Sequence, residues 1–183
     1  MEIVLASKSP RRKQLLALCG VDFKVQEANV DEILDESVSK VDAIEKLALH
    51  KAQTVFLHHP EALIIGADTI VLVDDEVLGK PIDTEDAKVM LRKLSGRTHQ
   101  VITGVCMMDQ YKTVTFSSVV EVDFCDLDEK EIDAYANSGE PMDKAGAYGI
   151  QGGAALFILS IRGDYYAVMG LPVSKVYEQL KNW

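Results

Sequence analysis

The chain has 183 residues, of which 48% are hydrophobic, and its 29 acidic side chains against 19 basic ones give a formal net charge of −10. This length and apolar content suffice for a hydrophobic core, and one domain over residues 1–183 is expected. The negative charge excludes a typical nucleic-acid partner, whose phosphates are bound chiefly by lysine and arginine. A small polyanionic ligand is compatible with it where basic residues converge locally.

The apolar segments are interrupted by charged residues or glycine before they are long enough to cross a bilayer, so no membrane partner is expected. The segment Met1–Ala6 has no basic residues ahead of its apolar stretch and does not read as a secretory signal. The three cysteines, Cys19, Cys106 and Cys125, are an odd number at wide spacing, which favours reduced thiols. These features together predict a cytoplasmic protein.

The N-terminal third reads as one strand and two helices. Ile3–Ala6 is a short apolar run typical of a buried strand. Ser9 and Pro10 then supply an N-cap and a first helical residue, and Gly20 is placed to end that helix. A second helix is expected over about residues 41–57, where apolar residues recur at helical spacing.

The middle of the chain reads as strands around one helix. The expected elements are, in order, a buried strand at residues 62–73, a turn at Asp74-Asp75, a short strand at 76–78, a helix opened by Asp83 or Thr84 and ended by Gly96, and two long strands at 99–108 and 113–124. Short turns between strands imply antiparallel pairing, while strand-helix-strand stretches allow parallel pairing.

The last third predicts a short helix, a hairpin and a final helix. Asp128 and Glu131 form a capping-box pattern, an irregular stretch follows at 140–153, and a hairpin is expected over 156–169 with its turn at Arg162-Gly163-Asp164. Pro172 opens the last helix. The whole pattern predicts an α/β fold with a mixed, twisted central sheet flanked by helices.

The turn after the first strand carries candidate ligands for an anion. Ser7, Ser9, Arg11 and Arg12 combine hydroxyl donors and two guanidinium forks with the free N–H groups of a helix start. This combination suits phosphate oxygens. The alternative is an ordinary N-cap with two solvated arginines, and the turn alone does not decide between them.

Two charged residues lie within apolar patterns. Asp68 interrupts a buried strand, where a carboxylate usually binds a cation, accepts hydrogen bonds or abstracts a proton. Lys51 lies on an apolar helix face, so it either extends to water or meets a buried anion. Lys80 in Gly79-Lys80-Pro81 is a surface lysine or points into a cleft. Glu32 lies in an acidic stretch with Asp31, Asp35 and Glu36; each of these carboxylates is solvated or completes a magnesium site, and the residues alone do not choose among them.

Several other classes of site are excluded by missing patterns. No HExxH or other histidine spacing indicates zinc, and no Walker A sequence or GxGxxG after a strand indicates a P-loop or a dinucleotide fold. The candidates that remain are acids and bases suited to a phosphate ligand.

Five motifs together resemble a known family. They are Leu5-Ala6-Ser7-x-Ser9-Pro10-Arg11-Arg12, Gly66-Ala67-Asp68-Thr69-Ile70-Val71, Gly79-Lys80-Pro81, Met90-Leu91-x-x-Leu94-Ser95-Gly96 with His99-x-Val101, and Glu140-Pro141-x-Asp143-Lys144-Ala145-Gly146-Ala147-Tyr148-Gly149-Ile150-Gln151-Gly152. This set, followed by Gly170-Leu171-Pro172, resembles the Maf family, also called septum-formation-inhibitor-like nucleotide pyrophosphatases, over essentially the whole chain.

The resemblance implies hydrolysis of a nucleoside triphosphate to the monophosphate and pyrophosphate with a divalent cation, Mg²⁺ or else Mn²⁺ or Co²⁺. It also implies an ITPase-like α/β fold with two lobes around a central cleft, and a homodimer. The stretch from Asp143 to Gly152 looks like the branch that acts on dTTP and UTP. A nucleotide-binding regulator of septum formation without turnover is the alternative.

Residue roles follow from the same resemblance. Asp68 falls on the family's proton acceptor, and Arg11, Thr69 and Gln151 fall on positions associated with substrate selection. Ser7, Arg12, Lys51 and Lys80 fall on or near substrate-binding positions, and Glu32 with Asp68 is the expected metal pair. We expect water to attack the α-phosphorus while basic residues hold the phosphates, with Asp68 acting as general base or as metal ligand.

Overall fold

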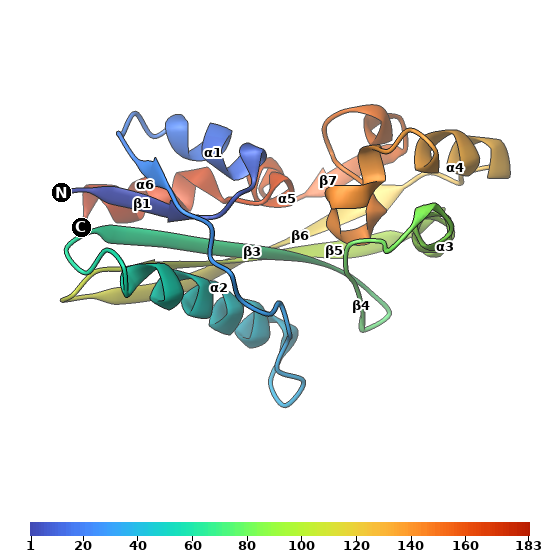
Figure 1. The fold of residues 1–183 in the computed structure, drawn as a ribbon. Helices are drawn as coiled ribbons and strands as arrows, with labels where there is room; N and C mark the ends of the chain where they lie inside the picture. The colour runs from blue at the N-terminus through green and yellow to red at the C-terminus, as the bar shows by residue number, and fades with distance from the viewer. The chain divides into compact units, whose positions relative to one another are not determined.

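The computed structural model describes residues 1–183 and has a seven-stranded mixed sheet with helices (Figure 1). The strand order is β2-β1-β3-β5-β6-β7, and β4 pairs with β3 off this path. The α/β fold with a mixed sheet is therefore confirmed. No helix is both long and apolar enough to span a membrane.

The chain divides into two compact units. Unit 1 comprises Met1–Thr69, Thr103–Ser118 and Gly170–Trp183, and unit 2 comprises Ile70–Ile102 and Val119–Met169. Three long strands, β3 (Leu63–Val73), β5 (Thr98–Met108) and β6 (Thr113–Phe124), contribute residues to both units. The single domain over residues 1–183 and the central cleft stay predictions.

Unit 1 is built on a parallel strand pair. Strand β1 pairs in parallel with both β2 and β3, with Ala6 opposite Gly66. Parallel strands end at the same edge of a sheet, so the residues that follow β1 lie beside the later part of β3. The remaining elements of the unit, besides its parts of β3, β5 and β6, are β1 (Ile3–Ala6), α1 (Pro10–Ala17), β2 (Lys24–Val25), α2 (Lys40–Phe56) and α6 (Val173–Lys181).

Two glycines bring helix α2 close to the strands of unit 1. A Cβ atom at Gly66 would lie 2.5 Å from the carbonyl oxygen of Ala48, and one at Gly104 would lie 2.7 Å from that of Ile44. Only glycine permits this backbone contact. The apolar face of α2 buries Ala48, Ala52 and Val55 against β1, β3 and β5 in one cluster.

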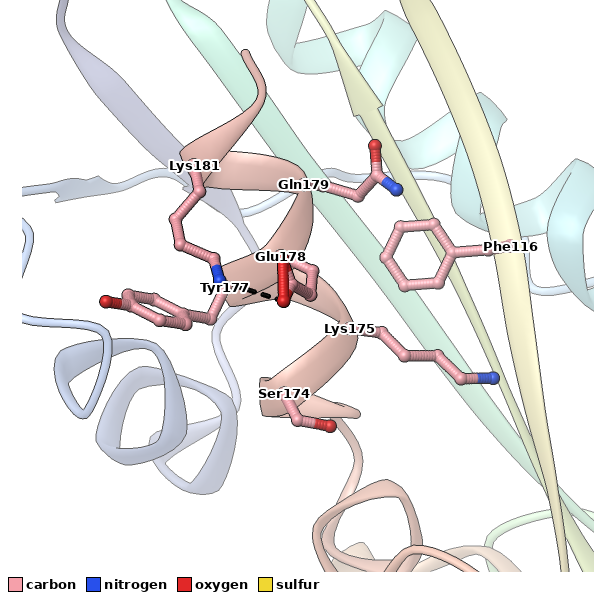
Figure 2. Close-up of a pocket in the computed structure, with 7 residues that line it drawn as sticks. All are labelled: Phe116, Ser174, Lys175, Tyr177, Glu178, Gln179 and Lys181. Atoms are coloured by element: carbon pink, nitrogen blue, oxygen red, sulfur yellow. Dashed lines mark hydrogen bonds and ion pairs between the residues drawn. The ribbon is translucent and has the colours of Figure 1, made fainter.

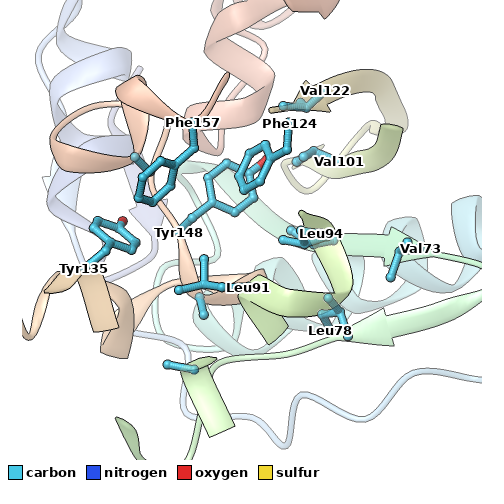
Figure 3. Close-up of a cluster of buried hydrophobic side chains, with 14 of the residues drawn as sticks. Val73, Leu78, Leu91, Leu94, Val101, Val122, Phe124, Tyr135, Tyr148 and Phe157 are labelled. Atoms are coloured by element: carbon cyan, nitrogen blue, oxygen red, sulfur yellow. The ribbon is translucent and has the colours of Figure 1, made fainter. Parts of the chain in front are cut away.

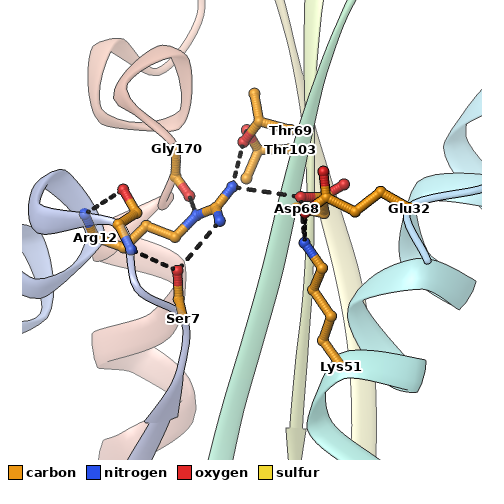
Figure 4. A network of polar contacts seen from close by, with 9 residues as sticks. Ser7, Arg12, Glu32, Lys51, Asp68, Thr69, Thr103 and Gly170 are labelled. Carbon is orange, nitrogen blue, oxygen red and sulfur yellow. Dashed lines mark hydrogen bonds and ion pairs between the residues drawn. The ribbon is translucent and has the colours of Figure 1, made fainter. Parts of the chain in front are cut away.

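Helices α1 and α2 lie on opposite sides of strand β3 (Figures 1 and 4). Ser9 caps α1 and Pro10 is its first residue, as the sequence predicts, and Leu15 and Leu16 are its buried face. Successive side chains of a strand point to opposite faces, so consecutive residues of β3 can serve different helices. Asp68 and Thr69 are such a pair.

Unit 2 has a core of aliphatic and aromatic side chains (Figure 3). Phe124 meets both Tyr148 and Phe157 edge-on, with ring centroids 4.8 Å and 6.3 Å apart, a favoured aromatic geometry. Besides its parts of β3, β5 and β6, unit 2 contains β4 (Glu76–Leu78), α3 (Thr84–Leu94), α4 (Glu129–Ala136), the 3-10 turns η1 (Glu140–Asp143), η2 (Ala145–Ala147) and η3 (Gly153–Leu156), β7 (Ile158–Arg162) and α5 (Tyr165–Met169).

Local sequence signals in unit 2 have mixed outcomes. The turn at Asp74-Asp75 and the capping box of Asp128 with Glu131 are confirmed. The hairpin predicted over residues 156–169 is wrong, because only its first half is a strand, paired with β6, and its second half is helix α5. Asp164 is the reason, since its carboxylate accepts from the N–H of Tyr166 at 2.9 Å and caps a helical turn.

Candidate active site

The serine-rich turn lies at the carboxyl end of strand β1. Ser7 directly follows the strand, and its hydroxyl accepts from the N–H of Ser9 at 3.2 Å, which bends the chain toward α1. The carboxyl ends of parallel strands are where open α/β sheets usually bind ligands. The turn, the start of α1 and the adjoining stretch of β3 therefore form the candidate binding edge of unit 1.

Lys51 joins two carboxylates (Figure 4). Its Nζ donates to Oδ1 of Asp68 at 2.8 Å and to Oε1 of Glu32 at 2.7 Å. The close approach of α2 at Gly66 makes this possible, because Asp68 follows that glycine by two residues on the same strand face. The question left open by the sequence is thus answered: Lys51 meets a buried anion, Asp68, and also pairs with the more exposed Glu32.

Arg12 reaches the same carboxylate from α1. Its Nη2 lies 3.9 Å from Oδ1 of Asp68 and donates to Oγ1 of Thr69 at 3.0 Å. Its Nε donates to the carbonyl of Gly170 at 2.8 Å, and Nη1 donates to the Ser7 hydroxyl at 3.4 Å. We call Ser7, Arg12, Glu32, Lys51, Asp68 and Thr69 the charged network.

The charged network is mostly withdrawn from solvent yet balanced in charge. Lys51 is 6% exposed and Asp68 is 8% exposed, while the side chain of Glu32 is 46% exposed. Burial lowers the pKa of the Arg12 guanidinium, and the Asp68 and Glu32 carboxylates oppose this. Two cations and two carboxylates offset one another, which buried charges require.

The paired carboxylates suit a hard divalent cation. Asp68 and Glu32 converge on one ammonium group, and each carboxylate has a second oxygen. Magnesium is commonly held by one or two carboxylates together with phosphate oxygens and water. No group of three or more His, Cys, Asp or Glu side chains is arranged for a metal. Asp68 and Glu32 are the two carboxylates that could hold such a cation together with phosphate oxygens.

The structure brings together six of the nine predicted site residues. The other three, Arg11, Lys80 and Gln151, lie outside this group. The six are those of the charged network. Arg11 precedes Arg12 on the first turn of α1. Lys80 and Gln151 belong to unit 2. Next to Lys80, the carbonyl of Gly79 accepts from the N–H of Gly146 at 3.0 Å. Gln151 is exposed and precedes η3.

Two contributors to this site were not predicted. Thr103 on β5 is completely buried, and its Oγ1 lies 2.8 Å from that of Thr69. The signal for it was a hydroxyl inside the apolar run of β5, the same kind of signal that marked Asp68. Gly170 acts through its backbone carbonyl, and side-chain chemistry gives no signal for such a contact.

A surface hollow in unit 1 is a poorer candidate (Figure 2). It has a volume of about 670 Å³, and none of the predicted site residues lines it. Lys181 is already paired there with Glu178 at 2.8 Å, and Lys175 donates to the carbonyl of Ser117. The hollow is lined by Phe116, Ser174, Lys175, Tyr177, Glu178, Gln179 and Lys181.

The fold and the site define an α/β protein with a buried, charge-balanced cluster beside an arginine- and serine-rich turn, a class suited to anionic ligands. The family model described as Maf-like protein matches residues 2–183. The chain belongs to the Maf family. A protein of Bacillus cytotoxicus is 50% identical over 182 residues, covering 100% of this chain and 95% of that one, and is named dTTP/UTP pyrophosphatase.

Further comparisons agree with these. A protein of Bacillus mycoides with the same name is 48% identical, again covering 100% of this chain and 95% of its own. The solved structure of a HAM1 protein from Coxiella burnetii covers 100% of both chains with a TM-score of 0.53 and 14% sequence identity. At that identity the likeness concerns the fold alone.

Proposed function

We propose that this chain hydrolyses nucleoside triphosphates, dTTP and UTP in particular, to the monophosphate and pyrophosphate. The observation that carries the proposal is the buried pair of Lys51 and Asp68 at the carboxyl end of the β1–β3 strand pair, beside the Ser7 turn. The names of the relatives in two Bacillus species support the reaction and the nucleotides. The alternative of a regulator without turnover is not favoured by those names.

Charge neutralisation accounts for much of the expected catalysis. Attack of water on the α-phosphorus moves negative charge toward the leaving pyrophosphate. In our proposal Lys51, Arg11 and the Ser7 turn meet the phosphate oxygens, which stabilises that charge where it develops. Because Lys51 is fixed by two carboxylates, its ammonium need not reorganise when the substrate arrives.

Asp68 has one of two roles in this scheme. As a general base it accepts a proton from the attacking water; as a ligand it helps Glu32 to hold a divalent cation. The bound cation would neutralise phosphate charge and make water more acidic. Both roles require an ionised carboxylate, and Lys51 at 2.8 Å and Arg12 at 3.9 Å bring positive charge beside it.

The remaining predicted contacts belong to substrate selection. We propose that Arg11, Thr69 and Gln151 distinguish dTTP and UTP from other nucleotides and that Lys80 contributes a further positive charge. We also propose that the enzyme acts as a homodimer in the cytoplasm. Light scattering over a range of protein concentrations tests the dimer, and a monomer at every concentration would contradict it.

Product analysis tests the reaction directly. Incubation with dTTP or UTP and Mg²⁺ is expected to release pyrophosphate and the monophosphate, resolved by ion-exchange chromatography. Orthophosphate as the first product would indicate a different phosphatase. Nucleotide binding without any product would support the regulator.

The cation requirement has its own test. Removal of divalent cations with a chelator is expected to stop hydrolysis, and addition of Mg²⁺, Mn²⁺ or Co²⁺ is expected to restore it. The variant Glu32→Gln should raise the Mg²⁺ concentration needed for half-maximal rate. Full activity in chelator would remove the cation from the mechanism.

A further inference from the structure

The guanidinium of Arg12 makes its closest contacts with the protein itself (Figure 4). Three of its nitrogens donate to three separate segments: the end of β1 at Ser7, strand β3 at Thr69 and the carbonyl of Gly170 before α6. A guanidinium is planar and presents its N–H groups in a rigid fork. Bonds to three segments therefore fix both its position and its plane.

The contact with Thr69 continues into strand β5. A guanidinium can only donate, so Oγ1 of Thr69 accepts from Arg12. The same Thr69 hydroxyl forms a second hydrogen bond with Oγ1 of Thr103, at 2.8 Å. Thr103 is completely buried. The chain Arg12, Thr69, Thr103 thus ties α1 to two neighbouring strands by directional bonds.

Gly170 is shaped for its part in this arrangement. Its φ of +117° is a conformation that residues with side chains rarely adopt. A Cβ atom there would lie 3.3 Å from Nε of Arg12 and 3.6 Å from Oγ1 of Thr69. The backbone before α6 is therefore held in a form that presents its carbonyl to Arg12 without a side chain in the way.

We propose that Arg12 and Thr103 are positioning residues for Asp68, in place of the phosphate contact that the sequence assigns to Arg12. Thr69 is the next residue of β3, so anchoring its side chain fixes the backbone that carries Asp68. Arg12 and Lys51 then stand near the same carboxylate oxygen at 3.9 Å and 2.8 Å and limit its rotation. The inference rests on the proposed function, since it concerns the rate of that reaction.

The variant Thr103→Val tests the inference at a residue too buried to touch substrate. Valine keeps the shape and removes the hydroxyl, so kcat for dTTP should fall about tenfold while KM stays within about twofold. Thr103→Ser retains the hydroxyl and should restore most of the rate. The matched control Thr115→Val, at an exposed position of β6, should leave both constants unchanged.

The variant Arg12→Lys keeps the charge and removes the fork. We expect kcat to fall about 100-fold, as for a displaced catalytic group, while the dissociation constant for the non-hydrolysable α,β-imido-dTTP changes less than about threefold by calorimetry. Arg92→Lys is the control, because Arg92 makes the same kind of fork to Glu129 on the surface of unit 2. Thermal melting confirms that each variant is folded.

The outcomes separate the inference from the proposed function. A rise of about tenfold or more in KM and in the analogue's dissociation constant, with kcat unchanged, would make Arg12 a phosphate ligand and overturn the inference alone. Equal loss in Thr103→Val and Thr103→Ser would overturn the role of the hydroxyl. A wild-type protein that releases no pyrophosphate would overturn the proposed function, and with it the reaction that this inference refines.

Discussion

Each unit buries one polar cluster, and the two clusters differ in charge. In unit 1 the charged network holds Lys51 against Asp68 and Glu32. In unit 2 the ring of His99 lies among aromatic side chains, and its Nε2 is 2.7 Å from the hydroxyl of Tyr148. One cluster is ionic and reaches solvent through Glu32; the other is surrounded by the aromatic core.

The two clusters differ in the free energy that their burial costs and in the chemistry that they can perform. Burying charges costs several kcal/mol per ion and is offset only by close partners. A neutral pair costs far less but is of little use for binding a phosphate. We infer that the charged network serves chemistry, whereas His99 and Tyr148 serve packing. Changes in the charged network should therefore affect rate, and changes at His99 and Tyr148 should affect stability.

The largest expected effect comes from Asp68→Asn. The amide keeps the shape but neither accepts a proton readily nor binds a cation well, so kcat should fall about 1,000-fold, or about 4 kcal/mol of transition-state stabilisation. Binding of α,β-imido-dTTP should persist. Initial-rate kinetics with dTTP and Mg²⁺ measure the first quantity, and calorimetry measures the second.

The control is the same substitution in another lysine–aspartate pair. On the surface of unit 1, Oδ2 of Asp35 lies 2.7 Å from Nζ of Lys46. Asp35→Asn should leave kcat unchanged, since exposed pairs contribute little. A wild-type rate in Asp68→Asn would remove Asp68 from the mechanism and end the contrast between the two clusters.

The next effect is a pH dependence of stability in unit 2. Burial lowers the pKa of His99 to about 4. Between pH 6.5 and pH 4 the unfolded chain binds a proton at this residue and the folded chain does not, so stability falls as the pH falls. Through this range the loss is about 3 kcal/mol, and it is absent above pH 6.5. Urea unfolding at several pH values measures it.

Other groups also titrate in acid, so a variant isolates the contribution of His99. His99→Gln should remove about 3 kcal/mol of the pH-dependent change in unfolding free energy, whereas His58→Gln, at an exposed position, should not. NMR titration of the wild-type ring gives the pKa directly. A ring that titrates near 6.5 in the folded protein would contradict the prediction.

A smaller loss of stability is expected from Tyr148→Phe. Nδ1 of His99 is already buried without a partner, and this change leaves Nε2 without one as well. The cost of one unsatisfied buried group is about 2 kcal/mol. Tyr111→Phe, at an 86% exposed side chain, is the control. A change below about 0.5 kcal/mol would mean that water satisfies the ring nitrogen.

The sequence was informative where one residue broke a local pattern. Asp68 in an apolar strand and Lys51 on an apolar helix face could be picked out because each sits where a charge is costly. The fold class followed from periodicity, and most helix starts followed from their caps. Local signals therefore sufficed for the main elements and for the principal charged residues.

The sequence could not supply contacts between distant segments. Arg12 bonds to Gly170, which is 158 residues away, and this depends on backbone geometry that no side-chain pattern encodes. Tyr165 and Tyr166 favour a strand by their side-chain type, but the hydrogen bond from the N–H of Tyr166 to the Asp164 carboxylate begins a helix there. The Arg12–Gly170 contact thus depends on tertiary structure, and helix α5 depends on a single local hydrogen bond.

The smallest expected effect concerns two helix caps, one in each unit. In α3 the Asp83 carboxylate accepts from the N–H of Asp86 at 2.8 Å, and Asp83→Ala should cost about 1 kcal/mol. In α1 the Ser9 hydroxyl accepts from the N–H of Arg12 at 3.4 Å, a long bond, so Ser9→Ala should cost only about 0.5 kcal/mol. Urea unfolding of both variants makes the comparison.

The weak cap at Ser9 sharpens the contrast between the units. The Ser9 hydroxyl accepts only this long bond and can donate its own proton to a phosphate oxygen, whereas the Asp83 carboxylate has no proton to donate. Ser9→Ala should therefore lower kcat/KM for dTTP by more than its loss of stability explains, while Asp83→Ala should not affect turnover. Equal losses of stability in the two variants, with turnover unchanged in both, would reduce Ser9 to an ordinary cap and confine the site to the charged network.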